Sequence, residues 1–192
     1  SVEDTMPLLI RTMCQAMGWA YGAHWTSDGN PARLHRAGWW CEFEPDFDPS
    51  DAQCWTEVVS LDAQGLLGAA WLGERATWVS DIAPLVNFRR QASCGKLGFR
   101  SGYAFPIRTH DEQLGVLEFF ARDCREPDQA LIEVSHAISR QIGQFIRRKR
   151  AEESLQESEQ QLRAVFDNAD VGIAMTDLDM RYVRVNDRFC AV

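Results

Sequence analysis

In the N-terminal part of the chain, the spacing of hydrophobic residues changes from that of a helix to that of a strand. Over residues 4–18 the apolar positions recur at helical spacing, which predicts an amphipathic helix that ends at Gly18. Over residues 19–25 the side chains alternate as in a strand, and the turn-forming residues 27–31 follow. The segment 34–43 has the pattern expected of a hairpin partner. A helix followed by an antiparallel strand pair is therefore predicted.

The middle of the chain contains shorter periodic segments. Helical patterns are predicted for residues 56–61, 69–72 and 87–97. Strands are predicted for residues 77–79, 101–108 and 113–121, with a polar turn between the last two. Because helices and strands are mixed without a regular alternation, the pattern predicts an α+β fold, an antiparallel sheet with flanking helices.

A long helix is predicted from Pro127 to beyond residue 160. Its first part has an apolar stripe at Leu131, Val134, Ile138, Ile142 and Phe145. Its second part is polar and keeps only a thin heptad-like seam at Ala151, Leu155, Ser158, Leu162 and Val165. Such a seam cannot be buried inside a small domain, so we expect a C-terminal coiled coil that makes a parallel homodimer. The heptad phase slips between Ile142 and Leu155.

The charge balance argues against a nucleic-acid surface. The net charge is −8, whereas phosphate backbones attract clustered Lys and Arg. The one basic run, 147–150, fits a solvated helix face paired in part with Glu152 and Glu153. No apolar run approaches the roughly 20 residues that span a bilayer, so no membrane contact is expected from this segment.

The cysteines give no sign of a metal centre or a disulfide framework. The six cysteines are scattered, without C-x-x-C pairs or a Cys/His grouping at zinc spacing. No metal ligands are predicted, and a reducing cytoplasm is the expected compartment.

Five phrases occur in the order seen in bacterial GAF domains: residues 18–25, 65–71, 78–81, 98–107 and 114–120. Residues 4–148 therefore resemble a complete GAF sensor domain. The resemblance implies an antiparallel sheet of six strands or a similar number, with the first and last helices on one face and a ligand pocket on the other. Residues 149–160 are then a signalling-helix linker.

The last part of the chain, residues 161–192, resembles the truncated start of a PAS domain. The resemblance implies an entry helix at 162–168, strands at 171–176 and 182–186, and a helix that starts at 186–189. A PAS sheet normally has five strands, so these elements cannot close a core by themselves.

The residues of the best-known GAF ligand classes do not match this chain. The cyclic-nucleotide signature Asn-Lys-x-Phe-Asp-Glu is missing, and Cys94 is followed by Gly95 rather than by the His expected at a bilin tether. His24, the one histidine in the first predicted strand, is interpreted as a core residue rather than a haem ligand. The GAF enzymes that reduce free methionine sulfoxide have a nucleophilic Cys in a turn where this chain has Leu66 and Leu67.

Catalytic residues are therefore not predicted, and no cofactor is identified. The resemblance places five aromatic residues near the expected pocket, and these are the ligand-binding candidates: Trp39, Trp78, Phe88, Tyr103 and Phe105. The function expected is the sensory input of a signalling protein, such as a histidine kinase or a cyclic-di-nucleotide enzyme, which binds a small molecule or transmits a signal through a dimeric helix. The alternative is a GAF dimerisation module without a ligand.

Overall fold

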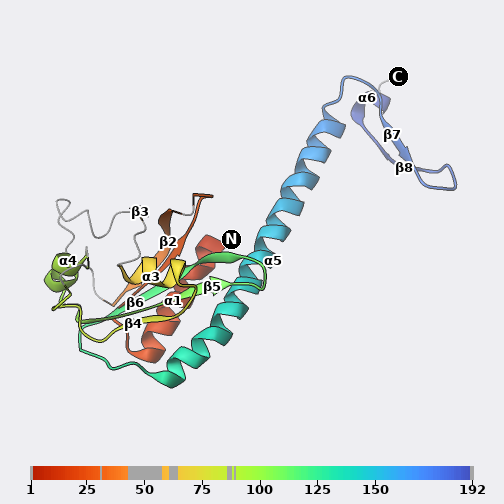
Figure 1. Cartoon of the computed structure of the whole chain (residues 1–192). Helices are drawn as coiled ribbons and strands as arrows, with labels where there is room; N and C mark the ends of the chain where they lie inside the picture. The colour runs from red at the N-terminus through yellow and green to blue at the C-terminus, as the bar shows by residue number, and fades with distance from the viewer. Residues whose placement is uncertain are drawn as a thin grey trace. The chain divides into compact units, whose positions relative to one another are not determined.

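A six-stranded antiparallel sheet organises the first of two units, Ser1–Arg147 and Arg148–Val192. The structure, a computed structural model, describes residues 2–30, 32–42, 65–85, 88 and 90–190, and the backbone of 58–60. The strand order is β3-β2-β1-β6-β5-β4, so the first and the last strand, β1 and β6, are neighbours in the middle of the sheet (Figure 1). The strands are β1 (Tyr21–Thr26), β2 (Arg33–Cys41), β3 (Val58–Ser60), β4 (Thr77–Val79), β5 (Ser101–Arg108) and β6 (Gln113–Ala121).

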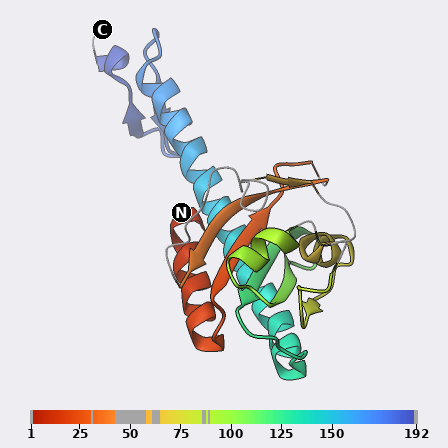
Figure 2. The same ribbon diagram turned by 90° about the vertical axis from the view of Figure 1, so that its left-hand side faces the viewer.

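Two helices cover one face of this sheet, which we call the inner face. They are α1 (Val2–Met17) and the first part of α5 (Gln129–Asp167) (Figures 1 and 2). Their buried side chains form one cluster with the side chains of β5 and β6 that point the same way, and Trp19 belongs to this cluster. Gly18, with φ of 69°, ends α1 because the left-handed backbone there suits glycine. The predicted arrangement of first and last helices on one face is confirmed.

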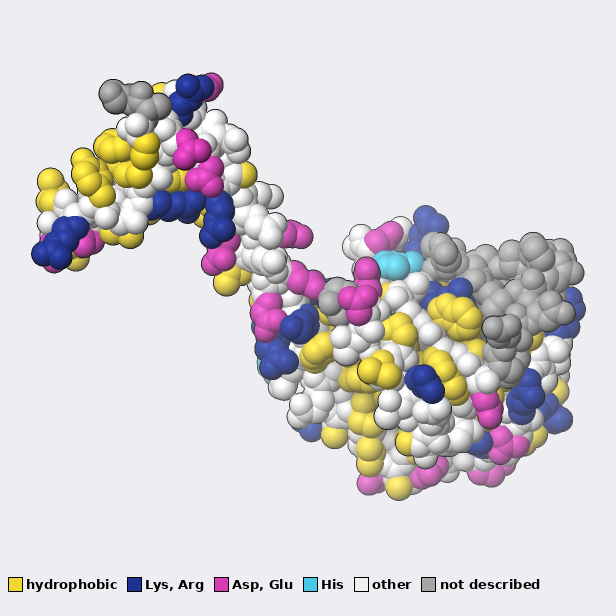
Figure 3. Space-filling model, turned by 180° about the vertical axis from the view of Figure 1, so that it is seen from behind, with side chains coloured by type: hydrophobic (Ala, Val, Ile, Leu, Met, Phe, Trp, Pro, Cys, Tyr) yellow, Lys and Arg dark blue, Asp and Glu magenta, His cyan; other side chains and the backbone are white. Residues whose placement is uncertain are grey.

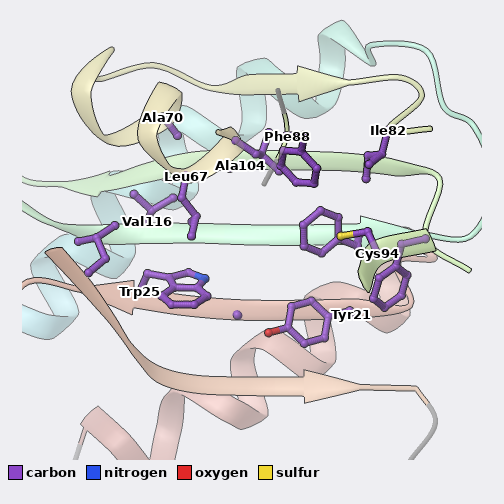
Figure 4. Close-up of a cluster of buried hydrophobic side chains, with 14 of the residues drawn as sticks. Tyr21, Trp25, Leu67, Ala70, Ile82, Phe88, Cys94, Ala104 and Val116 are labelled. Atoms are coloured by element: carbon purple, nitrogen blue, oxygen red, sulfur yellow. The ribbon is translucent and has the colours of Figure 1, made fainter. Parts of the chain in front are cut away.

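The opposite, outer face is covered by two short helices, α3 (Leu66–Leu72) and α4 (Gln91–Lys96). Figure 4 shows the core beneath them, with Tyr21 and Trp25 spaced along the same face of β1 and with Leu67 and Cys94 packed onto that face. Leu66 and Leu67, which open α3, are buried here. The burial of Cys94 fits its interpretation as a packing residue.

The buried side of α5 agrees with the predicted stripe in part: Ile142 is buried, and Leu131, Ile138 and Phe145 pack half-buried against the same core. Within the first unit the helix buries Ser135, Ser139, Ile142, Gly143 and Ile146. Val134 is 52% exposed, because the helix turns its small and hydroxylated residues toward the sheet and not the position of Val134. A prediction from apolar residues alone therefore misses Ser135, Ser139 and Gly143, which α5 also buries against the sheet.

One predicted helix is wrong. Within the segment 56–61, Val58–Ser60 forms strand β3, which pairs with the first residues of β2; the rest of that segment lies outside the described residues. The helical pattern of this segment is weak, and pairing with β2 at the sheet edge determines its structure. Val58 and Val59 are β-branched residues, a type that favours strands. The predictions of strands at 77–79, 101–108 and 113–121 are confirmed.

The second unit is a small hairpin with a short helix. It contains β7 (Ala174–Thr176), β8 (Tyr182–Val185) and α6 (Asp187–Cys190), at the positions expected for the start of a PAS domain. The Asn186 side chain holds them together, because its amide nitrogen donates to the carbonyls of Phe166 and Val171 and its oxygen accepts from the amides of Ile173 and Phe189.

The hairpin of the second unit leaves much of its apolar surface uncovered. Leu178 and Met180 are almost fully exposed, and Tyr182 and Val183 are more than half exposed. Figure 3 shows hydrophobic side chains gathered on this part of the molecule. Two strands and one turn of helix do not close a core among the described residues, as expected. Among the described helices, none has the length and apolar character needed to cross a membrane.

Candidate functional site

The carboxylate of Glu118 lies within the outer-face core. Glu118 is in the central strand β6, between Val116 and Phe120 on the same face, and its side chain is fully buried. In register, Glu118 pairs with Ala23 of β1 and Ala104 of β5. Because both neighbours are alanines, the sheet leaves room above it for a charged group and its partners.

The partner of this carboxylate is Arg90, the residue immediately before α4. One guanidinium nitrogen donates to Glu118 Oε2 at 2.8 Å, and the other contacts Oε1. The indole Nε1 of Trp25 also donates to Oε2, at 3.2 Å. Arg90 is only 7% exposed, so this two-pronged ion pair is buried from both sides.

Among the described residues, three aromatic rings lie close to the guanidinium. Its central carbon lies 5.4 Å from the ring centroid of Phe120, 5.6 Å from that of Phe88 and 5.8 Å from that of Trp25. Aromatic faces attract cations at these distances, most strongly where water is excluded. We call the group of Glu118, Trp25, Phe88 and Phe120 the cation cage, and Arg90 is its occupant in this structure.

The electrostatics of the cage favour a positive charge. Burial by itself lowers the pKa of the Arg90 guanidinium, but the Glu118 carboxylate and its hydrogen bonds outweigh burial and hold that pKa above its usual value. Burial likewise raises the pKa of the nearby Tyr21 hydroxyl, so this group stays neutral. Loss of one partner of a buried ion pair costs about 3–5 kcal/mol, because the other charge is left uncompensated.

The five aromatic candidates do not form one site. Phe88 is a wall of the cation cage, and Trp39, 38% exposed, lies opposite Ala23 with its ring 6.4 Å from that of Tyr21. These two candidates are therefore on the outer face.

The other three candidates belong to the inner face. Trp78, Tyr103 and Phe105 pack in the cluster beneath α1 and α5. The Tyr103 hydroxyl donates to Ser135 Oγ of α5 at 2.7 Å. The ring of Trp78 lies 4.9 Å from that of Tyr103 and 5.5 Å from that of Trp19. These three residues therefore pack between the sheet and helices α1 and α5, and they do not belong to the outer-face core.

Sequence reasoning missed Glu118 and Arg90. A signal was present, because Glu118 is the one charged residue in the apolar run 114–120. A carboxylate there must either interrupt the strand or find a buried partner. The partner lies 28 residues away, in the segment 87–97 whose helical pattern says nothing about which strand it packs against, so spacing could not reveal the pair.

The residues weighed for other chemistry lie in the core. His24 is buried between strands, and a side chain at Gly115 would come within 2.7 Å of its imidazole. Within the described residues, no group of three or more His, Cys, Asp or Glu side chains could hold a metal ion.

Among the residues that the structure describes, two cavities of the first unit are lined by residues outside the cation cage. One, of about 520 Å³, includes Trp19, Trp78 and Arg125 where α1 ends and α5 approaches. The other, of about 660 Å³, lies between the β5–β6 turn and α5 and is lined by Arg108, His110, Arg140 and Arg147, among others.

Comparison with known families gives two matches. A family model described as a GAF domain matches residues 1–147, and one described as a PAS domain matches residues 160–192. A search of curated protein sequences finds no match.

Solved structures similar to this chain are GAF domains and related proteins. The GAF domain of a phosphoenolpyruvate-protein phosphotransferase from Coxiella burnetii has a TM-score of 0.63 at 15% identity, covering 80% of this chain and 87% of that one. A domain assigned to a two-component sensor histidine kinase from Sinorhizobium meliloti 1021 has a TM-score of 0.60 at 14% identity, covering 81% and 98%. Free methionine-R-sulfoxide reductase from Neisseria meningitidis, solved with its substrate, has a TM-score of 0.56 at 14% identity, covering 72% and 74%. At these identities the likeness shows the fold alone.

Proposed function

The chain belongs to the GAF domain family, and we propose that it is the sensory input of a bacterial signalling protein. One observation carries the proposal: a single helix, α5, begins against the GAF sheet and continues to the segment matched by the PAS family. Covalent continuity gives any change at the sheet a direct route into the next module. The output is a histidine kinase or a cyclic-di-nucleotide enzyme in this proposal, in line with the kinase among the structural neighbours.

Specific contacts support the transmission step. Ser139 Oγ of α5 donates to the Pro106 carbonyl at 2.6 Å and accepts from the Arg108 amide at 3.2 Å. One turn further, Gly143 lets the helix approach the Arg108 carbonyl closely. The end of β5 is thus clamped to α5, so a shift of this strand is expected to move the helix with it.

A second copy of the chain is the proposed partner of the later part of α5. Leu155, Leu162 and Val165 are 62%, 68% and 70% exposed in the single chain, and they follow a heptad-like spacing. Arg148 and Lys149 pair with Glu152 along the helix, which fits a solvated face for the basic run. A parallel pair of helices would bury the seam and make helix spacing the transmitted variable.

The outer face is the proposed input site. It is covered by the short helices α3 and α4 and carries the buried ion pair of Arg90 and Glu118, where a small molecule could exchange contacts with either residue. A regulatory rather than catalytic role is proposed, because Leu66 and Leu67 are buried in the core where the sulfoxide-reducing relatives are expected to have their nucleophile.

Native mass spectrometry of protein purified without added ligand tests the input role, together with a thermal-shift panel of metabolites and nucleotides. We expect either a co-purified small molecule or a saturable rise in Tm that Phe88→Ala weakens and the exposed-surface variant Leu72→Ala leaves unchanged. If no compound is retained and none shifts Tm, the module without a ligand is the correct description.

A further inference from the structure

The cation cage has the composition of a binding site for a positively charged ligand, and it is filled by a side chain of the protein itself. We propose that Arg90 is an internal occupant and that a guanidine or primary amine of low molecular weight competes with it for Glu118 and the three rings. This inference rests on the proposed sensory function and names the ligand class of its outer-face site.

The two residues of the ion pair lie on different kinds of element: Glu118 is in a central strand, and Arg90 immediately precedes a short helix. Glu118 is in the middle of β6, with strands β1 and β5 on either side, so its position is fixed by the sheet. Arg90 precedes the six-residue helix α4, which lies outside the sheet and packs on it through the buried residues Ser93 and Cys94. The carboxylate is therefore the receptor part of the pair, and the arginine is the part that can leave.

Charge balance selects the ligand class. A cation that replaces Arg90 leaves Glu118 paired, while the freed guanidinium moves to water, where its charge is well solvated. An anion would have to draw Arg90 away from Glu118 and leave a carboxylate buried without a partner. A neutral ligand would do the same if it displaced Arg90. Only a cation conserves every buried charge.

The aromatic walls narrow the class further. Trp25, Phe88 and Phe120 present ring surfaces to the guanidinium at 5.4–5.8 Å, which favours a weakly hydrated planar cation over a strongly hydrated point charge. Trp25 Nε1, which donates to the carboxylate, would keep Glu118 oriented during the exchange. Guanidines are thus expected to bind more tightly than amines of the same length.

The first experiment is chemical rescue of the vacated cage. Arg90→Ala leaves Glu118 unpaired, and millimolar methylguanidinium should restore the lost stability in a saturable way, with a Tm rise of at least about 3 °C. Urea, a neutral molecule of similar shape, should give no such rise. The double variant Arg90→Ala/Glu118→Gln should lose the rescue, and Arg100→Ala, which vacates an exposed ion pair with Asp81, should show none.

The second experiment is calorimetric titration of the wild-type chain with methylguanidinium and agmatine, which needs no destabilised variant. Binding should be saturable and at least about 10-fold weaker than to Arg90→Ala, because the wild-type cage must first release its occupant. Rescue of the variant without any binding to the wild type would overturn the proposal and make Arg90 a structural residue. Wild-type binding confined to neutral or anionic compounds would overturn the cation class while the sensory function stood.

Discussion

The clamp between β5 and α5 predicts opposite effects for two glycine-to-alanine substitutions. Gly143 and Gly95 are both helical, in α5 and α4. A Cβ at position 143 would lie 2.5 Å from the Arg108 carbonyl oxygen and 2.9 Å from its carbon, whereas a Cβ at position 95 would meet nothing within 4 Å. The same chemical change therefore meets backbone at one site and open space at the other.

The magnitudes follow from two opposing terms. Alanine in a helix is favoured over glycine by about 0.5–1 kcal/mol, and at Gly95 this gain is expected in full. At Gly143 the overlap with rigid backbone costs about 1–3 kcal/mol. Any shift of α5 that relieves the overlap also stretches the two Ser139 hydrogen bonds, each worth about 1 kcal/mol. We expect Gly143→Ala to be destabilised by about 1–3 kcal/mol and Gly95→Ala to be stabilised slightly.

Urea unfolding followed by tryptophan fluorescence measures this difference. The seven tryptophans all lie before residue 80, so the signal reports the first unit and not the second. Unchanged m-values would assign the shift in midpoint to stability. If Gly143→Ala proved as stable as Gly95→Ala, α5 would not be held against the β5 carbonyl and the clamp would be refuted.

Three further results are expected. Tyr103→Phe should lose about 1 kcal/mol of unfolding free energy, since the hydroxyl bond to Ser135 is removed while the ring packing stays. Ending the chain at Arg147 should weaken dimerisation in light scattering, and an unchanged dimer would move the interface to the first unit. Stability should fall as pH rises above about 9, by up to about 1.4 kcal/mol per pH unit per group, because burial raises the pKa of the Cys14 thiol to about 12 and that of the Tyr21 hydroxyl as well. The unfolded chain then loses these protons first, and Cys14→Ala should flatten the slope in denaturation series at alkaline pH.

Most of the fold could be predicted from sequence because its strongest elements are locally encoded. Strands β5 and β6 are continuous apolar runs joined by a polar turn, and their bounds follow directly from it. Strand β3 was mistaken for helix because three residues carry little periodic information and the pairing with β2 is not local.

The candidate site could be predicted far less well, because its parts are brought together by the sheet. Aromatic side chains such as Tyr103 and Phe105 were chosen by their strand, and the pleat turns both toward the helices instead. The two charged residues of the site, Glu118 and Arg90, come from segments that are distant in sequence. The serines that attach α5 to β5 are polar residues at a buried interface, which an apolar pattern passes over.

In the proposed mechanism, occupancy of the outer face changes how the α5 helices of two copies pair. Sedimentation equilibrium of the wild-type chain, with and without saturating methylguanidinium, tests it directly. Because coupling between sites is reciprocal, we expect the dimer dissociation constant to change by about 5-fold or more when the cage is occupied. An identical dissociation constant at full occupancy would contradict it.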